Sequence, residues 1–362
     1  MTIIYFLLLL SAIILIHEAG HLVAAKLFGV YCYEFSFGMG PVLLKHKGKE
    51  TQYSLRALPV GGFVAMAGET DGDEAYPDVE VPAGRRLTEK KPWQKIIIML
   101  AGVFMNFVLA FMIFSLVILH NGTFASSPKA VVSTVVENSP AEKAGFQSGD
   151  KILEITKKDG SSIKPETFMD MQAFSSGYAD EETYKIDRDG EILSITLTPE
   201  YSEEQDAYLI GITGERSEYV DVNILNCWKF GLEEMGAITK LMIATIAGLI
   251  FHGAGMSQLS GPVGIYQATE TYASMGLSAF LLLIAQLSLN VGIFNLLPLP
   301  VLDGGQVVIT LLEWITNRQF STKIKTAIMI ACWVLLIGLM VFVTWNDIAR
   351  LIGGFNYKEV KR

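Results

Sequence analysis

Four long apolar runs constrain this chain more than any other feature of its sequence. Each reaches or exceeds the roughly 20 residues that a helix needs to cross about 30 Å of hydrocarbon. Charged residues make up only 18% of the chain, whereas a soluble domain carries about 25%. The runs predict a polytopic α-helical membrane protein with about four transmembrane helices. They cover residues 3–28, 96–119, 277–302 and 326–345.

The first run begins close to the N-terminus, so a cleavable signal peptide is the alternative to a membrane span. No basic region precedes it, and no convincing small-residue cleavage site follows it. We therefore expect a retained transmembrane helix over residues 1–28.

Charge and cysteine content exclude two other classes of function. The net charge of −9 gives no reason to expect a nucleic acid partner, because phosphate binding needs a basic surface. Cys32, Cys227 and Cys332 are widely spaced and form neither a disulfide framework nor a CxxC metal motif.

A polar insert separates the second apolar run from the third. Residues 129–221 contain 20 acidic and 9 basic residues, and short β-type runs alternate with Gly, Ser and Asp turns. This pattern predicts a compact soluble domain over residues 126–221. The following stretch, 230–251, is apolar but carries Glu233, Glu234 and Lys240, which favours an amphipathic helix on or against the membrane.

The short loops predict the orientation in the membrane. Nine Lys and Arg residues lie between residues 45 and 95, which indicates a cytoplasmic segment by the positive-inside rule. The insert is then extracytoplasmic. The C-terminal tail disagrees, because Lys358, Lys361 and Arg362 fall on the predicted outer side.

These observations divide the chain into eight segments. We expect transmembrane helices over 1–28, 96–120, 277–316 and 324–347, a cytoplasmic segment over 29–95, the extracytoplasmic domain over 126–221, an amphipathic membrane-associated region over 225–275 and a tail over 348–362.

His17-Glu18-Ala19-Gly20-His21 carries the chemistry of the first span. On a helix, His17 and His21 lie one turn apart on one face, so two imidazoles can bind one zinc ion. Glu18 lies beside them and can act as the catalytic base towards a water molecule whose pKa the metal lowers. Ionisable residues inside a span are costly and point to function.

A catalytic zinc ion usually has a third protein ligand. His120 and His252 lie at the predicted outer side, whereas Asp303 follows the inner end of the third span, at the depth of the histidine motif. Asp303 could instead cap a helix over 306–315, since Asp before Gly-Gly suits that position. Both interpretations stay open at this point.

Three motifs together resemble the site-2 protease family, most closely its bacterial regulator of sigma-E protease branch. The first is HEAGH in a first span, the second is Leu259-Ser-Gly-Pro-Val-Gly264, and the third is Asn295-Leu-Leu-Pro-Leu-Pro-Val-Leu-Asp303-Gly-Gly. In the insert, Ser139-Pro-Ala-Glu-Lys-Ala-Gly145 and Ser148-Gly-Asp-Lys-Ile-Leu153 look like a PDZ domain.

The resemblance implies an intramembrane zinc endopeptidase of the bacterial cytoplasmic (inner) membrane. It implies His17, His21 and Asp303 as zinc ligands and Glu18 as catalytic base. The substrates would be single-span membrane proteins, such as anti-sigma factors or remnant signal peptides, cut after a first extracytoplasmic cleavage. Membrane lipid, and peptide C-termini at an α+β PDZ domain, are further implied partners.

The resemblance also implies functional roles for residues outside the HExxH motif, and several of these residues have an alternative structural role. Gly102 and Asn106 match a GxxxN pattern that packs the second helix near the site, although Gly102 also suits ordinary close helix packing. Residues 59–63 resemble a cytoplasmic membrane-associated re-entrant β-loop, and the alternative is a hairpin with a Gly-Gly turn. The resemblance implies these substrate-binding residues: Gly61, Gly62, Phe63, Asn290, Asn295, Pro298 and Pro300.

The third span has a physical reason to be irregular. Prolines interrupt a helix and release backbone groups that can bond an extended substrate, which membranes tolerate only around a cavity. Asn295 could instead satisfy the helix break itself.

Two features differ from some members of the family. Larger members carry two tandem PDZ domains, whereas this insert holds one, and Gln306 stands where some relatives have His.

Two other classes of protein were weighed. A membrane adaptor with structural zinc would need four protein ligands, and a metal transporter would need ligands at several depths. The chain offers three ligands in one cluster, which favours a protease.

Overall fold

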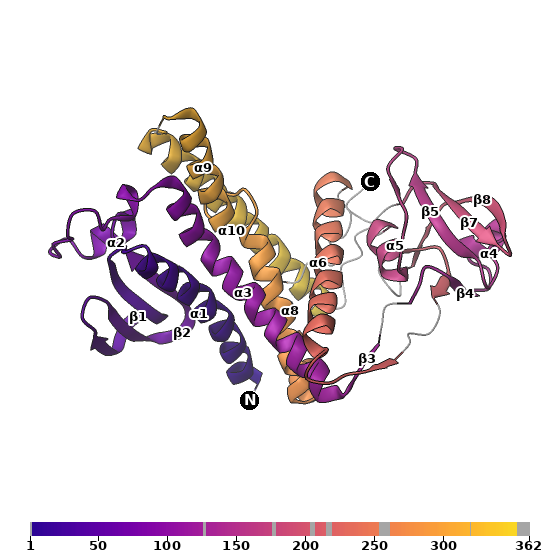
Figure 1. The fold of residues 1–362 in the computed structure, drawn as a ribbon, viewed down its shortest axis with the longest axis horizontal. Coiled ribbons are helices and arrows are strands. Elements are labelled where there is room, and N and C mark those ends of the chain that lie inside the picture. Colours follow the sequence, from indigo (N-terminus) through magenta and orange to yellow (C-terminus); the bar gives the residue numbers. More distant parts are fainter. Residues whose placement is uncertain are drawn as a thin grey trace. The chain divides into compact units, whose positions relative to one another are not determined.

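The computed structural model describes residues 2–125, 128–175, 179–202, 207–214, 219–252, 261–318 and 320–352. The chain divides into two compact units. The first comprises Met1–Ile113 and Ser260–Arg362, and the second comprises Phe114–Leu259. Figure 1 shows the helices and strands of each unit.

Four helices of the described part are long and apolar enough to cross a membrane. They correspond to the four apolar runs of the sequence. These segments are α1 (Thr2–Leu27), α3 (Pro92–Asn121), α8 (Leu277–Asn295) and Lys323–Ala349 within α10 (Thr322–Ile352). With the β-rich remainder of the chain, they fit a polytopic membrane protein.

The third predicted helix is wrong in one respect, because residues 277–316 form two helices. α8 ends at Asn295 and α9 (Asp303–Thr316) begins eight residues later. Pro298 and Pro300 lie between them, and proline cannot continue a helix because it lacks the N–H group and clashes with the preceding turn. Short-range backbone hydrogen bonds, such as Leu302 N–H to the Leu299 carbonyl at 2.8 Å, stabilise the connection.

In the first unit, β1 (Cys32–Lys47) and β2 (Gln52–Met66) form a bent antiparallel hairpin. Residues 34–37 pair with 62–65 and also with 52–55, so the two long strands fold into a small curled sheet. Segment 62–66 is paired on one side only in this register, so it forms an edge of the sheet. A short helix, α2 (Thr70–Ala75), and a 3₁₀ turn, η1 (Leu87–Glu89), follow.

α1 lies at the centre of the first unit. Its N-terminal half packs Leu9 and Ile13 against Phe280, Leu283 and Ile284 of α8. Its C-terminal half joins a second apolar cluster with β1, β2 and α3. The sheet and the helix bundle are therefore both fixed to the helix that carries the HExxH motif.

α7 (Pro262–Ser274) begins with a cap from another helix. Its N-cap residue, Gly261, offers no side chain, and the Asp347 carboxylate of α10 instead accepts a 2.8 Å hydrogen bond from the N–H of Gly264. Asp347 is 3% exposed, so this contact is a buried tie between α7 and α10.

The second unit contains an α+β domain in the polar insert (Figure 1). Its main sheet has the strand order β6-β5-β7-β8, and its apolar core includes Ile152, Ile155, Tyr184 and Ile186. The β-type runs of the sequence at 130–136, 151–155, 182–187 and 193–198 overlap β4, β5, β7 and β8. The strands are β3 (Thr123–Ala125), β4 (Val132–Val135), β5 (Lys151–Lys157), β6 (Ser162–Ile163), β7 (Glu182–Arg188), β8 (Glu191–Leu197), β9 (Glu200–Ser202), β10 (Ala207–Leu209), β11 (Ile212–Gly214) and β12 (Tyr219–Asp221).

The helices of the second unit also follow from local sequence. For α4 (Pro140–Ala144), the Ser139 hydroxyl accepts a hydrogen bond from the N–H of Glu142, and Gly145 ends the helix at φ 90°. α5 (Phe168–Ser175) packs with α6 (Cys227–His252), which covers the predicted amphipathic stretch.

A buried ion pair joins two parts of the α+β domain. Asp150 is fully buried and receives two hydrogen bonds from the Arg188 guanidinium, at 2.7 and 2.8 Å, and one from the N–H of Gln147. Burial raises the pKa of Asp150, but these hydrogen bonds outweigh it and hold the pKa below its ordinary value. The stability from this pair is therefore present above about pH 4 and is lost as the pH falls through the depressed pKa.

We expect Arg188→Leu to destabilise this domain by about 3–5 kcal/mol at neutral pH, because it leaves a buried carboxylate without its partner. Part of that loss should be recovered below about pH 5, where the stranded carboxyl protonates. Hydrogen exchange of β5 and β7 in the full chain, corrected for intrinsic pH effects, measures both changes. Identical pH profiles in wild type and variant would contradict this account.

Candidate metal centre

The two histidines of the HExxH motif face the same point inside the first unit. Both lie on α1, and each is 8% exposed. Their Nε2 atoms are 3.2 Å apart, as expected for residues one helical turn apart on one face. Their burial and their shared direction make them a pair that can bind one ion.

Asp303 completes this group. Its Oδ2 atom lies 3.2 Å from His17 Nε2 and 3.5 Å from His21 Nε2. The helix-cap interpretation is wrong, because the N-cap of α9 is Leu302 and Asp303 is the first helical residue. Among the described residues, no other group of three or more His, Cys, Asp or Glu side chains brings its ligand atoms close enough together to bind one metal ion.

Two glycines allow Asp303 to reach the histidines. A Cβ atom on Gly304 would lie 2.3 Å from the Leu296 carbonyl oxygen, and one on Gly305 would lie 2.1 Å from that of Leu299. The Asp-Gly-Gly sequence therefore lets α9 begin directly against the end of the preceding connection. Gln306 adds a 2.6 Å hydrogen bond to the Pro300 carbonyl, which holds the same turn.

The donor set fits a zinc ion. Tetrahedral zinc with bonds of about 2.0–2.2 Å separates its ligand atoms by about 3.3–3.5 Å, and the three separations here are 3.2, 3.2 and 3.5 Å. Asp303 Oδ2 is also a buried oxygen without a hydrogen-bond donor in the described structure. Three lone-pair atoms that face one another repel unless a cation lies between them.

α3 orients both imidazoles. The Nδ1–H of His21 donates a 2.8 Å hydrogen bond to the Ile98 carbonyl, which leaves the Nε2 lone pair available. The Asn106 amide lies 3.3 Å from His17 Nδ1, and its Oδ1 is buried without a partner. Exchanging the amide oxygen and nitrogen, which leaves the shape unchanged, lets Oδ1 accept from Nδ1–H of His17.

Gly102 lies between these two contacts on the same face of α3. A Cβ atom there would come within 2.4 Å of His21 Nε2 and 2.8 Å of His17 Cε1. Of the two interpretations that the sequence left open for the GxxxN pattern, the structure supports the one that places α3 at the site. Ile98 contributes only its carbonyl group, so no residue-type signal could have identified it.

The edge of the curled sheet lies beside Glu18. A Cβ atom on Gly62 would lie 3.8 Å from Glu18 Cγ, and Glu18 lines the same cavity as Phe63 and Val64 of this edge. The alternative of a hairpin with a Gly-Gly turn is wrong, because Gly61 and Gly62 lie within β2 and the hairpin turns at residues 48–51.

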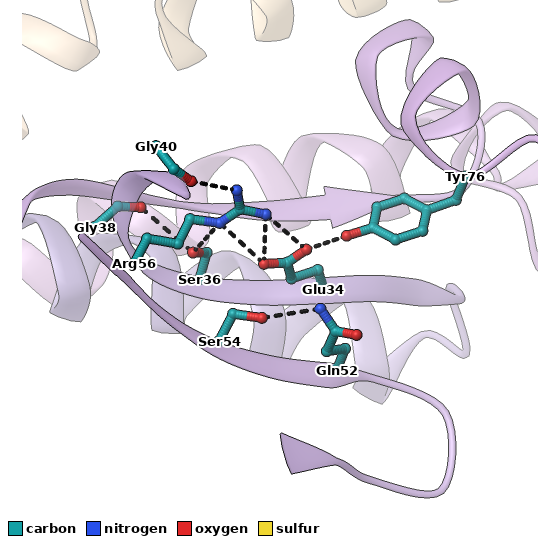
Figure 2. Close-up of polar contacts among 8 residues, drawn as sticks. All are labelled: Glu34, Ser36, Gly38, Gly40, Gln52, Ser54, Arg56 and Tyr76. Atoms are coloured by element: carbon teal, nitrogen blue, oxygen red, sulfur yellow. Dashed lines mark hydrogen bonds and ion pairs between the residues drawn. The ribbon is translucent and has the colours of Figure 1, made fainter. Parts of the chain in front are cut away.

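A buried polar network holds this sheet in shape (Figure 2). Glu34 is fully buried and binds the Arg56 guanidinium at 2.8 and 3.0 Å, while Arg56 also donates to Ser36 Oγ and the Gly40 carbonyl. Tyr76 donates to Glu34 from the segment after α2. Burial raises the pKa of Glu34, but Tyr76 and Arg56 outweigh it and keep the pKa below its ordinary value.

The sequence did not reveal this network, because Glu34 and Arg56 are 22 residues apart and form no motif. Arg56 also stacks over the Phe63 ring at 5.0 Å. The network therefore ties the middle of the sheet to its catalytic edge.

A cavity of about 1240 Å³ surrounds the site. His17, Glu18, His21 and Asp303 line it together with Phe63 and Asn295. The other expected substrate-binding residues do not line it in the described structure. Of these, Gly61 and Gly62 lie in β2, Asn290 lies in α8 with a buried unpartnered Oδ1 atom, and Pro298 and Pro300 lie in the connection after α8.

We expect Gly102→Ala to lower zinc occupancy, because its methyl group takes the space of both imidazole rings. Gly236→Ala on α6 is the matched control, since a Cβ atom there meets nothing within 4 Å. Metal analysis of the purified proteins after dialysis should show a several-fold lower zinc content only in the Gly102 variant. Full zinc content in both would mean that α3 does not constrain the histidines.

Comparison with known proteins agrees with this chemistry. The model of Peptidase family M50 matches residues 5–339. A Clostridium perfringens protein named as a zinc metalloprotease is 37% identical over 96% of this chain and 98% of its own length. Another, from Clostridium acetobutylicum, is 35% identical over 94% and 96%. RasP of Bacillus subtilis, named as a regulator of sigma-W protease, is 29% identical over 97% and 99%. The chain therefore belongs to Peptidase family M50, the site-2 proteases, and is a polytopic zinc metalloprotease.

Proposed function

We propose that this metalloprotease is an endopeptidase that cuts single-span membrane proteins within the bilayer, after a first extracytoplasmic cut. The supporting observation is the convergence of His17, His21 and Asp303 beside Glu18, in a unit built from membrane-length helices. RasP is named for a sigma-factor pathway, so anti-sigma factors are the proposed substrate type, with remnant signal peptides as a second.

The proposed location is the bacterial cytoplasmic membrane. The nine basic residues between positions 45 and 95 put that segment and the curled sheet on the cytoplasmic side. The acidic α+β domain over 126–221 is then extracytoplasmic. Its Ser139–Gly145 and Ser148–Leu153 motifs support a PDZ domain that excludes bulky ectodomains or binds a new peptide C-terminus.

In this proposal, His17, His21 and Asp303 hold the zinc ion. When bound, the ion acts as a Lewis acid towards the scissile carbonyl and lowers the pKa of the attacking water. Glu18 positions that water, accepts its proton and passes a proton to the leaving amine. Glu18 lines the cavity beside the sheet edge that contains Gly62 and Val64.

Two backbone features would hold the substrate. A peptide bond in a helix is shielded by its own hydrogen bonds, so the substrate must be extended at the cleavage point. The edge segment 62–66 offers backbone groups for strand addition next to Glu18. Asn295 at the end of α8, with Val301 and Leu302 of the following connection, lines the same cavity, and Pro298 and Pro300 prevent the helix from continuing through that connection.

The absence of a fourth protein ligand in the described structure also supports catalysis. A structural zinc site is closed by four protein ligands, whereas a catalytic site keeps one position open for water or substrate. The group here has three members.

Glu18→Gln should remove cleavage and keep the metal. The amide retains size and polarity but cannot accept the proton, so we expect activity to fall by about 10²–10⁴-fold with unchanged zinc content. The assay is cleavage of a tagged single-span substrate by purified protein in detergent, with and without a zinc chelator. Near wild-type turnover in this variant, or chelator-resistant cleavage, would rule out the mechanism.

Asp303→Ala should instead lose the metal. Removing one of three ligands is expected to lower zinc content together with activity. Asp180→Ala, which removes an exposed carboxylate of the α+β domain, serves as the control and should keep both. If Asp303→Ala retained full zinc content and full activity, Asp303 would not be a ligand.

A further inference from the structure

The catalytic cavity extends to a charged cluster that the mechanism does not use. Lys95 of α3, Glu313 of α9 and Lys325 of α10 all line the cavity. They interact electrostatically with one another. Two ammonium groups and the Glu313 carboxylate therefore line the same cavity as Glu18.

Glu313 is already committed to Lys325. Its Oε1 atom lies 2.7 Å from Lys325 Nζ and accepts a 2.8 Å hydrogen bond from the N–H of Phe320. These contacts hold the turn between α9 and α10. The pair is a structural tie, and it does not neutralise a second cation.

Lys95 is the remaining cation. Its Nζ atom donates a 3.0 Å hydrogen bond to the Thr88 carbonyl, and no carboxylate of the described residues lies within ion-pair distance. The other cavity-lining cations, Arg56 and Lys325, each have an ion-pair partner. Lys95 and Lys325 share the single charge of Glu313, so the cluster keeps a net positive charge, and a partly buried ammonium group without an ion pair favours a further anion nearby.

Lys95 also stands in line with the metal centre. On α3, the residues that contact the histidines are Ile98, Gly102 and Asn106, which are four residues apart and lie on one face of the helix. Lys95 is three residues before Ile98 and therefore lies on the same face. Three residues advance about 4.5 Å along a helix. Asp303 and Glu313 lie ten residues apart on α9, or about 15 Å.

We propose that Lys95 binds an acidic side chain of the substrate, on the cytoplasmic side of the scissile bond, and thereby sets a sequence preference of the protease. This inference rests on the proposed function and adds a specificity-determining residue to it. An extended chain advances about 3.3 Å per residue, so these two offsets place the acidic position about one to five residues from the scissile bond.

A lipid headgroup is the competing anion, because basic residues near helix ends often meet phosphates. The geometry favours the substrate, since Lys95 lines the catalytic cavity whereas its neighbour Lys91 is exposed and does not. Lys91 therefore provides the matched control for removing one positive charge at the same membrane surface.

The test uses the zinc-loaded full chain in zwitterionic nanodiscs. Single-span substrates carry Gln at eight positions on the cytoplasmic side of the mapped cleavage site, and one Gln at a time is replaced by Glu. The readout is the ratio of kcat/KM for the Glu substrate to that for the all-Gln substrate. This ratio is internal to each enzyme, so a lower yield of a variant does not affect it.

We expect the wild type to prefer Glu by about tenfold at one position about one to five residues from the cut, because a hydrogen bond between charged groups contributes about that much. Lys95→Gln should reduce the ratio to about one, Lys95→Arg should retain it, and Lys95→Glu should favour a Lys at the same position. Lys91→Gln should keep the wild-type ratio.

Three results would overturn the proposal. One is a flat wild-type profile, and another is a preference that survives in Lys95→Gln. The third is a variant effect that appears only when anionic lipid is added and does not depend on substrate sequence, which would assign Lys95 to a lipid headgroup. If the zinc-loaded wild type cut no substrate of the series, including the all-Gln one, the proposed function itself would fail.

Discussion

Three lone-pair donors that face one another within an apolar unit are the constraint on which the rest of the structure depends. His17 Nε2, His21 Nε2 and Asp303 Oδ2 lie 3.2–3.5 Å apart. In low-dielectric surroundings such an arrangement is unfavourable without a cation between the donors. The neighbouring features serve it: Gly102 clears the space for the rings, the Ile98 carbonyl fixes one tautomer, and Gly304 lets α9 approach.

The same region supplies backbone groups that a regular membrane helix would hide. The sheet edge 62–66 lies beside Glu18, and the prolines after α8 end that helix at the cavity. Exposed backbone is tolerated at membrane depth only where it lines a cavity. The Glu34–Arg56 network then has a clear physical role, because a curled sheet of two strands needs a buried clamp to keep its edge in position.

Much of the site could be predicted from sequence because it is encoded locally. His17, Glu18 and His21 follow from spacing on one helix, and Gly102 and Asn106 from a second short motif. Asp303 lies 282 residues beyond His21, so spacing left the ligand and cap interpretations open. Its expected depth in the membrane already favoured the ligand, and the resemblance strengthened that interpretation. The third helix was predicted too long because hydropathy continues through Pro298 and Pro300, although the backbone cannot.

The sequence by itself determined the membrane-spanning runs, the histidine pair with the adjacent Glu18, and the α+β insert, since each depends on periodicity or composition over a few turns of chain. Only the tertiary structure decided which distant groups meet. In the sequence, nothing distinguishes Arg56 and Glu34 from other charged residues, and only the folded sheet brings them into contact. Lys95 resembled any other basic residue at a helix start until three helices placed it in the catalytic cavity. The physical reason is that the energy of a charged group depends on the groups that surround it in space. Those groups come from segments far apart in the sequence, and no local sequence pattern indicates that these segments pack together.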